Sequence, residues 1–367
     1  MKVLSALRRS LRLLWPRPAP PVPQEVFQPG CPAALSPEAL NQVCEEHFHS
    51  PYHRVCYTHL SGWKASGAYR LFLTLASGAQ ITLIFKNAVY DPHQTPALAG
   101  LPLHPGPPEW AILRSTYPPL ARWTAAVYLA QAVAPPAHYQ YLLADLAPHY
   151  RPLRPDRRLL PIVELLPAIH QTLAGWLAAG QPERLLDFGP AFQNRLFDYA
   201  RAGLLAYHNR FHAPRIAQAL SALAPLEERY QRHLRRSAPP LTAIHGDLNY
   251  ANILLHPQDP QDAKLLDWEW AGLGQPHADL AALLKGTNPA LERRAFRRYA
   301  SANPHLSLAE HRRLYLWCKI ERGLLDAGFL AAQAALTGHE TRFNLHAAVS
   351  AALNRVHSAQ RELSEDG

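Results

Sequence analysis

The chain has 367 residues, enough for two globular lobes, and its 48% hydrophobic and 18% charged residues are typical of a folded protein rather than a disordered one. No stretch approaches the roughly 20 consecutive apolar residues that a membrane-spanning helix needs. The 37 basic and 28 acidic residues give a net charge of +9; the first 17 residues hold +5 of it, and the +4 left for the other 350 does not favour nucleic acid as a partner.

Residues 1–23 form a basic tail and a Pro-rich linker. Leucines recur at helical spacing within residues 1–17, five basic residues lie among them, and no acidic residue is present. Arginines interrupt the apolar run that a signal peptide would need. We expect either weak contact of residues 1–17 with an anionic membrane surface or packing of this arm on the protein itself.

The segment after the tail combines one helix with several strands. A helix is predicted over residues 37–49, with Ser36 as its N-cap and Pro37 at its first position. A second helix opens at Glu109, after two prolines. Strands are predicted where apolar residues alternate between turn residues, over 55–60, 68–75, 80–85, 125–133 and 139–146.

The second half of the chain has a different pattern. From about residue 160 it is helical nearly to the C-terminus, interrupted by one β-rich island over residues 241–270. We therefore expect an α+β protein in which the tail and linker (1–23) precede a β-rich N-terminal lobe (24–148) and a mostly helical C-terminal lobe (149–367).

Three polar residues of the island are suited to phosphoryl transfer. Asp247 lies in a loop after one strand, Asn252 begins the outgoing strand, and Asp267 follows that strand's hairpin partner. Phosphoryl transfer needs a carboxylate near the acceptor hydroxyl and oxygen ligands for Mg²⁺. Asp247 can meet the hydroxyl, and the hairpin can bring Asn252 and Asp267 to one metal ion. A plain β-hairpin with polar caps would explain each residue singly, but not all three in order.

The motif His-Gly-Asp-x-x-x-x-Asn at 245–252, followed by Asp-Trp-Glu at 267–269, resembles the aminoglycoside phosphotransferase and choline kinase group of small-molecule kinases. It is similar to the His-Arg-Asp-x-x-x-x-Asn and Asp-Phe-Gly pair of protein kinases. The resemblance implies a bilobal protein-kinase-like fold. It also implies that Asp247 is the catalytic base, that Asn252 and Asp267 are Mg²⁺ ligands, and that His245 and Asp279 are structural braces of the loop.

Lys86 and Glu109 are the candidates for gripping the phosphates of ATP. Lys86 ends the third predicted strand, as the resemblance requires, and its apolar strand neighbours favour a buried anionic partner. The alternative is a strand-end lysine that points to water. Glu109 is the candidate ion-pair partner of Lys86; the alternative is a first-turn acid favoured by the helix dipole.

Two further segments are expected to bind the nucleotide. The loop over residues 61–67 lies between the first two long strands, where a phosphate-covering loop belongs, although it has two glycines and not three. The strand over 141–146 resembles the hinge of the kinase group, where backbone amides meet adenine. The nucleotide-binding candidates in these segments are Gly62, Ser66, Gly67, Leu143, Asp145 and Leu146.

The cysteines and histidines point away from zinc and disulfides. The four cysteines include no Cys-x-x-Cys pair, which argues against a zinc ribbon and a disulfide scaffold and favours a reduced, cytoplasmic setting. Cysteines and histidines crowd together over residues 44–56, but their gaps match no common zinc finger.

The composition also bears on the acceptor. Residues 151–367 hold 26 basic and 21 acidic residues, whereas a polycationic aminoglycoside would prefer an acid-lined cleft. Glu269, Glu321 and Asp326 could still form a local acidic pocket. Tyr315 and Trp317 could cap a sugar ring or a quaternary ammonium, although packing in a helical core is the more common role of such residues.

These observations predict an ATP- and Mg²⁺-dependent phosphotransferase that moves the γ-phosphate to a hydroxyl of a small molecule. The acceptor is expected to be a sugar, an amino alcohol such as choline, or thiamine, with an aminoglycoside less favoured. The alternatives are a protein kinase, for which an Ala-Pro-Glu segment after Asp267 is missing, and a catalytically silent nucleotide-binding scaffold. The sequence leaves the oligomeric state open.

Overall fold

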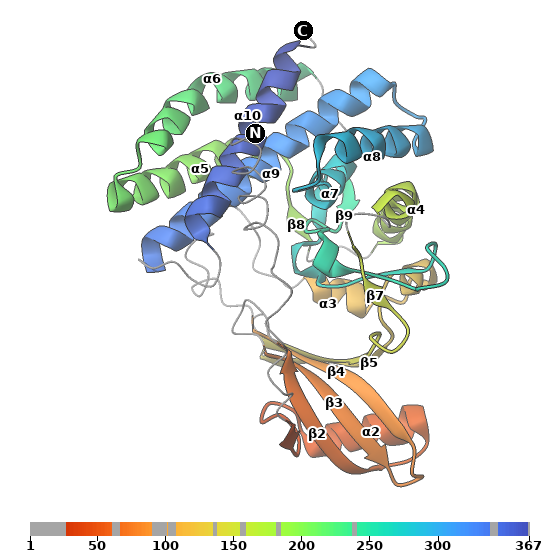
Figure 1. Cartoon of the computed structure of the whole chain (residues 1–367). Coiled ribbons are helices and arrows are strands. Elements are labelled where there is room, and N and C mark those ends of the chain that lie inside the picture. Colours follow the sequence, from red (N-terminus) through yellow and green to blue (C-terminus); the bar gives the residue numbers. More distant parts are fainter. Residues whose placement is uncertain are drawn as a thin grey trace, which may run out of the picture.

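The computed structural model describes residues 27–60, 67–89, 101, 108–134, 138–154, 159–180, 185–236, 241–337 and 344–365. A β-sheet lobe and a larger helical lobe lie at opposite ends of the described chain (Figure 1). The predicted α+β, bilobal architecture is therefore confirmed. The basic tail predicted over residues 1–23 lies outside the described residues, so its membrane contact stays a prediction.

The N-terminal lobe is built on a six-stranded antiparallel sheet in the order β1-β2-β3-β4-β6-β5. Along parts of β3 and β4, buried side chains alternate with half-buried ones, as expected where one face of a sheet is covered. The strands are β1 (Gln28–Pro29), β2 (Tyr52–Leu60), β3 (Gly67–Leu75), β4 (Gln80–Val89), β5 (Val127–Ala134) and β6 (His138–Ala144).

Helix α2 (Pro37–Phe48) covers one face of this sheet (Figure 1). It begins as predicted, because the Ser36 side chain accepts a hydrogen bond from the Ala39 amide and Pro37 stands at the first helical position. Its apolar side packs on the strands and closes a small core. Cys44 is one of the residues buried in that core.

The C-terminal lobe packs its helices around one large apolar core. Helix α9 lies at its centre and packs on α5 and α10; a Cβ at Gly203 would lie 2.3 Å from the carbonyl oxygen of Gly328, so α5 and α9 touch through their backbones. The helices are α4 (Leu159–Ala178), α5 (Pro190–Phe211), α6 (Pro214–Arg236), α7 (Pro276–Leu283), α8 (Pro289–Ala302), α9 (Leu308–Thr337) and α10 (Leu345–Glu365).

The predicted β-rich island forms two small sheets between α6 and α7. One sheet joins β11, β10 and β7, and the other joins β8, β12 and β9. The strands are β7 (Arg151–Pro152), β8 (Leu186–Asp187), β9 (Thr242–Ile244), β10 (Ile253–Leu255), β11 (Ala263–Leu265) and β12 (Gly272–Gly274). The two-residue strands β7 and β8 lie in stretches where the sequence predicted no strand.

Three short helices complete the junction between the lobes. They are α3 (Pro108–Leu113), which begins where the sequence predicted it, and the 3₁₀ turns η3 (Pro118–Arg122) and η5 (Trp268–Trp270). Helix α3 packs against η5, so a segment from the first half of the chain meets the island. None of the helices in the described ranges combines the length and the apolar character that a membrane crossing requires.

Candidate active site

The loop between β9 and β10 is held in a tight, internally bonded conformation. Gly246 has a φ of 78°, and a Cβ there would lie 1.9 Å from the Trp270 carbonyl oxygen, so only glycine fits. The neighbouring His245 is fully buried. Its Nε2 lies 2.9 Å from the Leu266 carbonyl oxygen, and its ring packs on Trp268 with centroids 4.5 Å apart. His245 therefore ties the loop to the end of β11, as expected of a brace.

Asp279, in the first turn of α7, holds the same loop through hydrogen bonds to its carboxylate. Its carboxylate accepts hydrogen bonds from the amides of His245 (2.9 Å) and Gly246 (2.8 Å), and His170 Nε2 lies 3.2 Å away. Burial alone would raise the pKa of the Asp279 carboxyl, but the hydrogen bond and charge of His170 outweigh it and lower that pKa. The bracing contacts expected of Asp279 are present.

Asp247 projects from this loop with both carboxylate oxygens engaged. Asn249 Nδ2 donates to Oδ2 at 3.0 Å, and Asn252 Nδ2 donates to the same oxygen at 3.3 Å and to the Asp247 carbonyl at 2.9 Å. The Asp247 side chain is 21% exposed, so a substrate can still reach it. Asn249 was missing from the sequence candidates, although it also caps the 3₁₀ turn η4 (Tyr250–Asn252).

Arg322, on α9, holds the other oxygen of Asp247. Its guanidinium donates to Asp247 Oδ1 at 2.5 Å and to the Gly246 carbonyl at 2.7 Å. Its Nε donates to Asp326 Oδ1 at 3.2 Å, one turn further along the helix. No sequence motif marks Arg322; its only signal is a charged residue within the apolar pattern of α9.

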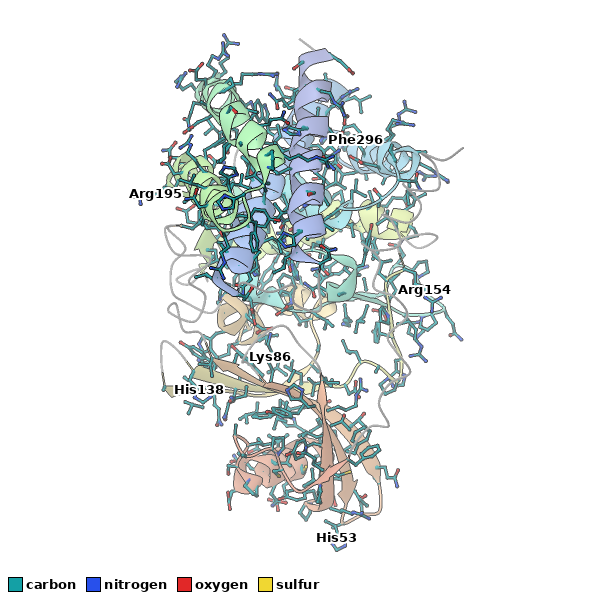
Figure 2. The ribbon with its side chains drawn as sticks, turned by 60° about the vertical axis from the view of Figure 1, so that its left-hand side comes forward. His53, Lys86, His138, Arg154, Arg195 and Phe296 are labelled. Atoms are coloured by element: carbon teal, nitrogen blue, oxygen red, sulfur yellow. The ribbon has the colours of Figure 1, made fainter. Side chains whose placement is uncertain are left out.

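Lys86 lies on β4, at the side of the sheet lobe that faces the helical lobe (Figure 2). Its ammonium contacts three carboxylates at the junction of the lobes. Its Nζ lies 2.7 Å from Glu109 Oε2, 3.0 Å from Asp267 Oδ1 and 3.5 Å from Glu269 Oε1. The predicted ion pair with Glu109 is present, and the alternative of a lysine pointing to water is wrong. Burial would lower the pKa of Lys86, but these carboxylates more than offset it and raise that pKa, so the amine stays charged.

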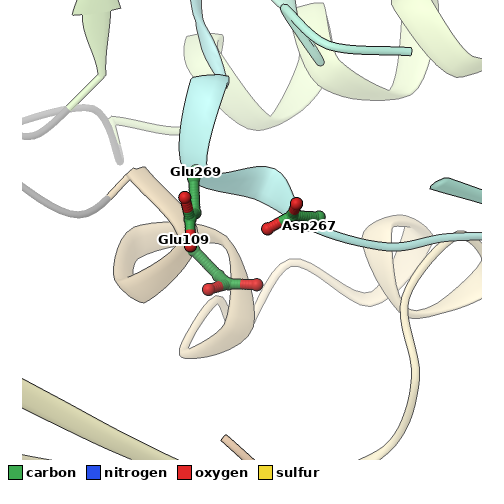
Figure 3. A group of neighbouring side chains, drawn as sticks. All are labelled: Glu109, Asp267 and Glu269. Carbon is green, nitrogen blue, oxygen red and sulfur yellow. The ribbon is translucent and has the colours of Figure 1, made fainter. Parts of the chain in front are cut away.

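The three carboxylates form a group that could hold a cation. Oxygens of Glu109, Asp267 and Glu269 lie within 4.8 Å of one another, with Glu109 on α3 and the other two at η5 (Figure 3). Asp267 takes a left-handed conformation with a φ of 61°, which ends the run of β11 and turns its side chain out of the strand. Hard oxygen donors of this kind suit Mg²⁺.

The β10–β11 hairpin connects the two halves of the site. Ile253 pairs with Leu265, and the Leu266 amide donates to the Asn252 carbonyl at 2.8 Å, so residue 252 and residue 267 stand at the same end of the hairpin. Their side chains make different contacts: Asn252 donates to Asp247, and Asp267 pairs with Lys86. Joint ligation of one Mg²⁺ by Asn252 and Asp267 stays a prediction.

The nucleotide-binding candidates of the sheet lobe lie on adjacent strands. Leu143 on β6 pairs with Ile84 on β4, two residues before Lys86. The Asp145 carboxylate, which follows β6, pairs with Arg70 Nε at 2.9 Å and accepts from the Ala147 amide at 3.0 Å, so its side chain has a structural partner. Leu146 follows it. Gly67 begins β3, whereas Gly62 and Ser66 lie outside the described residues.

The acidic pocket that the sequence left open is not assembled. Asp326 is surrounded by three cationic side chains, Glu321 accepts a 2.5 Å hydrogen bond from the Tyr230 hydroxyl, and Glu269 faces Lys86. These acids therefore have separate partners. Tyr315 and Trp317 are buried among the C-terminal helices, so core packing is their role.

Comparison with known proteins gives one family match. Residues 149–317 match the model of the phosphotransferase enzyme family (APH). No curated protein matches the chain. The match covers the loop of Asp247, the β10–β11 hairpin and Asp279, and it confirms the predicted resemblance and the phosphotransferase enzyme class.

Solved structures of small-molecule kinases share the fold along most of the chain. The choline kinase LicA from Streptococcus pneumoniae is 14% identical, with a TM-score of 0.55, over 88% of this chain and 98% of that one. A choline kinase from Cryptosporidium parvum Iowa II is 12% identical, with a TM-score of 0.59, over 90% and 97%. The spectinomycin phosphotransferase APH(9)-Ia is 12% identical, with a TM-score of 0.56, over 88% and 98%.

Proposed function

Starting from a phosphotransferase of this family and fold, we propose that the chain transfers the γ-phosphoryl group of ATP to a hydroxyl of a small molecule. The observation that carries the proposal is the ion pair between Lys86 of the sheet lobe and Asp267 of the helical lobe, beside the braced loop that presents Asp247. Phosphoryl transfer is catalysed largely by positioning and by charge stabilisation, and this arrangement supplies both.

Asp247 is the proposed base. In the reaction the acceptor hydroxyl gives its proton to the Asp247 carboxylate, and its oxygen forms a bond to the γ-phosphorus. The bond from that phosphorus to the β–γ bridging oxygen breaks, and ADP leaves. Arg322 and Asn249 each hold one oxygen of Asp247, so they fix the carboxylate's orientation toward the hydroxyl.

The residues present fit Mg²⁺ and the phosphates. We expect Asp267 and Asn252 to hold the metal, because their donors are hard oxygens and Asp267 already belongs to a group of convergent carboxylates. The bound metal would neutralise phosphate charge. Lys86, anchored by Glu109, is expected to contact the phosphate oxygens.

The sheet lobe is the proposed nucleotide site. Structures of LicA in complex with AMP and of APH(9)-Ia in complex with ADP and spectinomycin support nucleotide use by this fold. We propose that Gly62, Ser66 and Gly67 lie over the phosphates and that Leu143, Asp145 and Leu146 meet the nucleotide at the hinge. A small-molecule acceptor, and not a nucleic acid, is the expected partner.

The alternatives make different predictions. Residues 268–275 alone separate Asp267 from α7, which leaves no room for the long activation loop of a protein kinase. A silent scaffold would bind nucleotide without turning it over.

Substitution of Asp247 separates a kinase from a silent scaffold. With a panel of hydroxylated metabolites and Mg-ATP, we expect ADP release with at least one acceptor. Asp247→Asn should lower that turnover by about 10²–10⁴-fold, with ATP affinity retained, because a general base contributes about that factor. The control is Asp259→Asn, which changes an exposed carboxylate in the β10–β11 turn. Unchanged turnover in Asp247→Asn would refute the base.

A further inference from the structure

Three cationic side chains surround one carboxylate beside the proposed base. Asp326 Oδ2 lies 2.7 Å from Lys285 Nζ and 2.7 Å from Arg355 Nη2, and its Oδ1 lies 3.2 Å from Arg322 Nε. The three cations come from different parts of the chain, namely the segment after α7, helix α9 and helix α10. We call Lys285, Arg322, Arg355 and Asp326 the cationic cluster.

Arg322 connects the cationic cluster directly to the proposed base. Arg322 bonds Asp326 with its Nε and Asp247 with its Nη2, so one guanidinium spans both carboxylates. Asp247 and Asp326 together balance two of the three positive charges, and one remains in excess. Opposite charges at such distances attract strongly where water is partly excluded, so the excess positive charge favours binding of an anionic ligand.

The cationic cluster is also accessible to a solute. The side chains of Lys285 and Arg355 are 38% and 20% exposed, and Asp326 beneath them is 11% exposed. The side chain of Lys285 is thus the most exposed of the group. A ligand group that reaches Lys285 or Arg355 can bind without displacing the contact between Arg322 and Asp247.

From this arrangement we propose that the acceptor carries an anionic group, a carboxylate or a phosphate, near the hydroxyl that receives the phosphoryl group. The inference rests on the proposed function, because it takes Asp247 as the point where that hydroxyl binds. A hydroxyl on Asp247 places the rest of a small molecule beside Arg322, and an anion there meets the cationic cluster. A cationic acceptor such as choline or an aminoglycoside would be repelled.

The acids that could have favoured a cationic acceptor have other partners. Glu321 lies one residue before Arg322 but accepts a hydrogen bond from the Tyr230 hydroxyl, and Glu269 pairs with Lys86. Asp326, the remaining acid, is the one that the three cations surround.

Binding of matched small molecules tests the acceptor's charge. The full chain, loaded with ADP and Mg²⁺, is titrated by calorimetry with glycerate, glycerol 3-phosphate, glycerol and choline. We expect one or both acids to bind at least about tenfold more tightly than glycerol and choline, and the preference to shrink as salt is raised. The two acids distinguish a carboxylate from a phosphate.

Two variants link the binding to the cluster. Lys285→Gln leaves Asp326 with two cations, so the fold should persist, which its melting curve checks; it should weaken binding of the preferred acid by about fivefold or more. The control is Arg297→Gln, which removes an exposed cation on α8, in a surface hollow lined with arginines, and should leave binding unchanged.

The inference would be overturned if neither acid binds at concentrations up to about 10 mM, which corresponds to a binding free energy near −3 kcal/mol. It would also be overturned if glycerol or choline binds as tightly as the acids, or if Lys285→Gln and Arg297→Gln have the same effect on binding. Each of these can occur while ADP–Mg²⁺ binds and Asp247→Asn abolishes turnover, in which case the proposed function stands without an anionic acceptor. Failure to bind nucleotide would count against the proposed function instead.

Discussion

Arg322 Nη2 lies 2.5 Å from Asp247 Oδ1, and the same guanidinium donates to the Gly246 carbonyl at 2.7 Å. The planar fork of an arginine suits two acceptors at once, and here it fixes both the side chain of the proposed base and the backbone of its loop. Burial would lower the pKa of Arg322, but Asp326 and Asp247 offset this and raise that pKa, so the charge persists at every accessible pH. Arg322 is therefore a positioning residue for Asp247.

Arg322→Lys should lower kcat by about 10- to 100-fold, or about 1.4–2.7 kcal/mol, while nucleotide affinity stays the same. The ammonium keeps the charge but cannot span Gly246 and Asp247 together. Steady-state kinetics with the best acceptor measures the change. A role through Asp247 also requires that Arg322→Lys has little further effect in the Asp247→Asn background. An equal fall in both backgrounds would show that Arg322 acts elsewhere.

Lys86→Met should destabilise the fold by about 3 kcal/mol, because it leaves the carboxylates of Glu109, Asp267 and Glu269 close together without their shared cation. Added Mg²⁺ or Ca²⁺ should then raise the melting temperature of the variant more than that of the unsubstituted protein, since the oxygens can bind the ion. Differential scanning fluorimetry measures both effects.

Lys319→Met is the matched control for this experiment. Lys319 Nζ also lies near two carboxylates, at 2.6 Å from Glu292 and 3.8 Å from Glu362, but on the far helices α8 and α10. Its melting temperature should respond to divalent cations as the unsubstituted protein does. An equal response of the two variants would argue that the carboxylates around Lys86 are not a cation site.

The strands and loop that carry the candidate site could be predicted from sequence because their signals are local. His245, Asp247 and Asn252 fall in one loop at fixed spacing, and Asp267 follows a strand whose hairpin partner is next to it in the chain. Lys86 could also be assigned, since a lysine at the end of an apolar strand needs a partner. For Glu109 the sequence left two possibilities, the partner of Lys86 or a first-turn acid, and the fold decides between them, because the segment between Lys86 and Glu109 gives no geometric constraint.

The residues that sequence reasoning missed act across long separations. Arg322 lies 75 residues after Asp247, within a helix whose other residues are mostly core, so no spacing rule connects the two. The sequence suggests Asp326 for an acidic pocket. Arg322 is its neighbour one turn away on α9, but Lys285 and Arg355 come close only when the segment after α7 and helix α10 pack on α9. The strands β7 and β8 span two residues each, too few for an alternation pattern.

Asp279→Asn should destabilise the protein by about 3 kcal/mol, because the amide offers one acceptor oxygen where the carboxylate receives two backbone amides and faces His170. The effect should concentrate in the catalytic loop. Hydrogen exchange followed by mass spectrometry should show faster exchange of the amides of His245 and Gly246, and urea unfolding gives the free energy. If exchange in that loop is unchanged, Asp279 supports α7 alone.

Glu321 gives the protein a pH-dependent loss of stability. Burial raises the pKa of Glu321 from 4.5 to about 7, although the hydrogen bond from Tyr230 partly opposes this. Between these two values the folded protein binds a proton that the unfolded chain releases. The contribution of Glu321 to the free energy of unfolding is therefore fully present below pH 4.5 and is lost as the pH rises through 7.

Glu321→Gln removes this titration while keeping an acceptor for the Tyr230 hydroxyl. Between pH 4.5 and pH 7, the unfolding free energy of the variant should rise by about 2 kcal/mol relative to that of the unsubstituted protein, and the difference should then level off. The full pKa shift would correspond to a change in that free energy of roughly 3 kcal/mol. Urea unfolding at a series of pH values measures it. Glu164→Gln, a carboxylate paired with Arg298 at the surface, is the control and should show no such rise. A constant difference across this pH range would mean that Glu321 is already ionised in the folded protein at pH 4.5, and that water reaches its carboxylate.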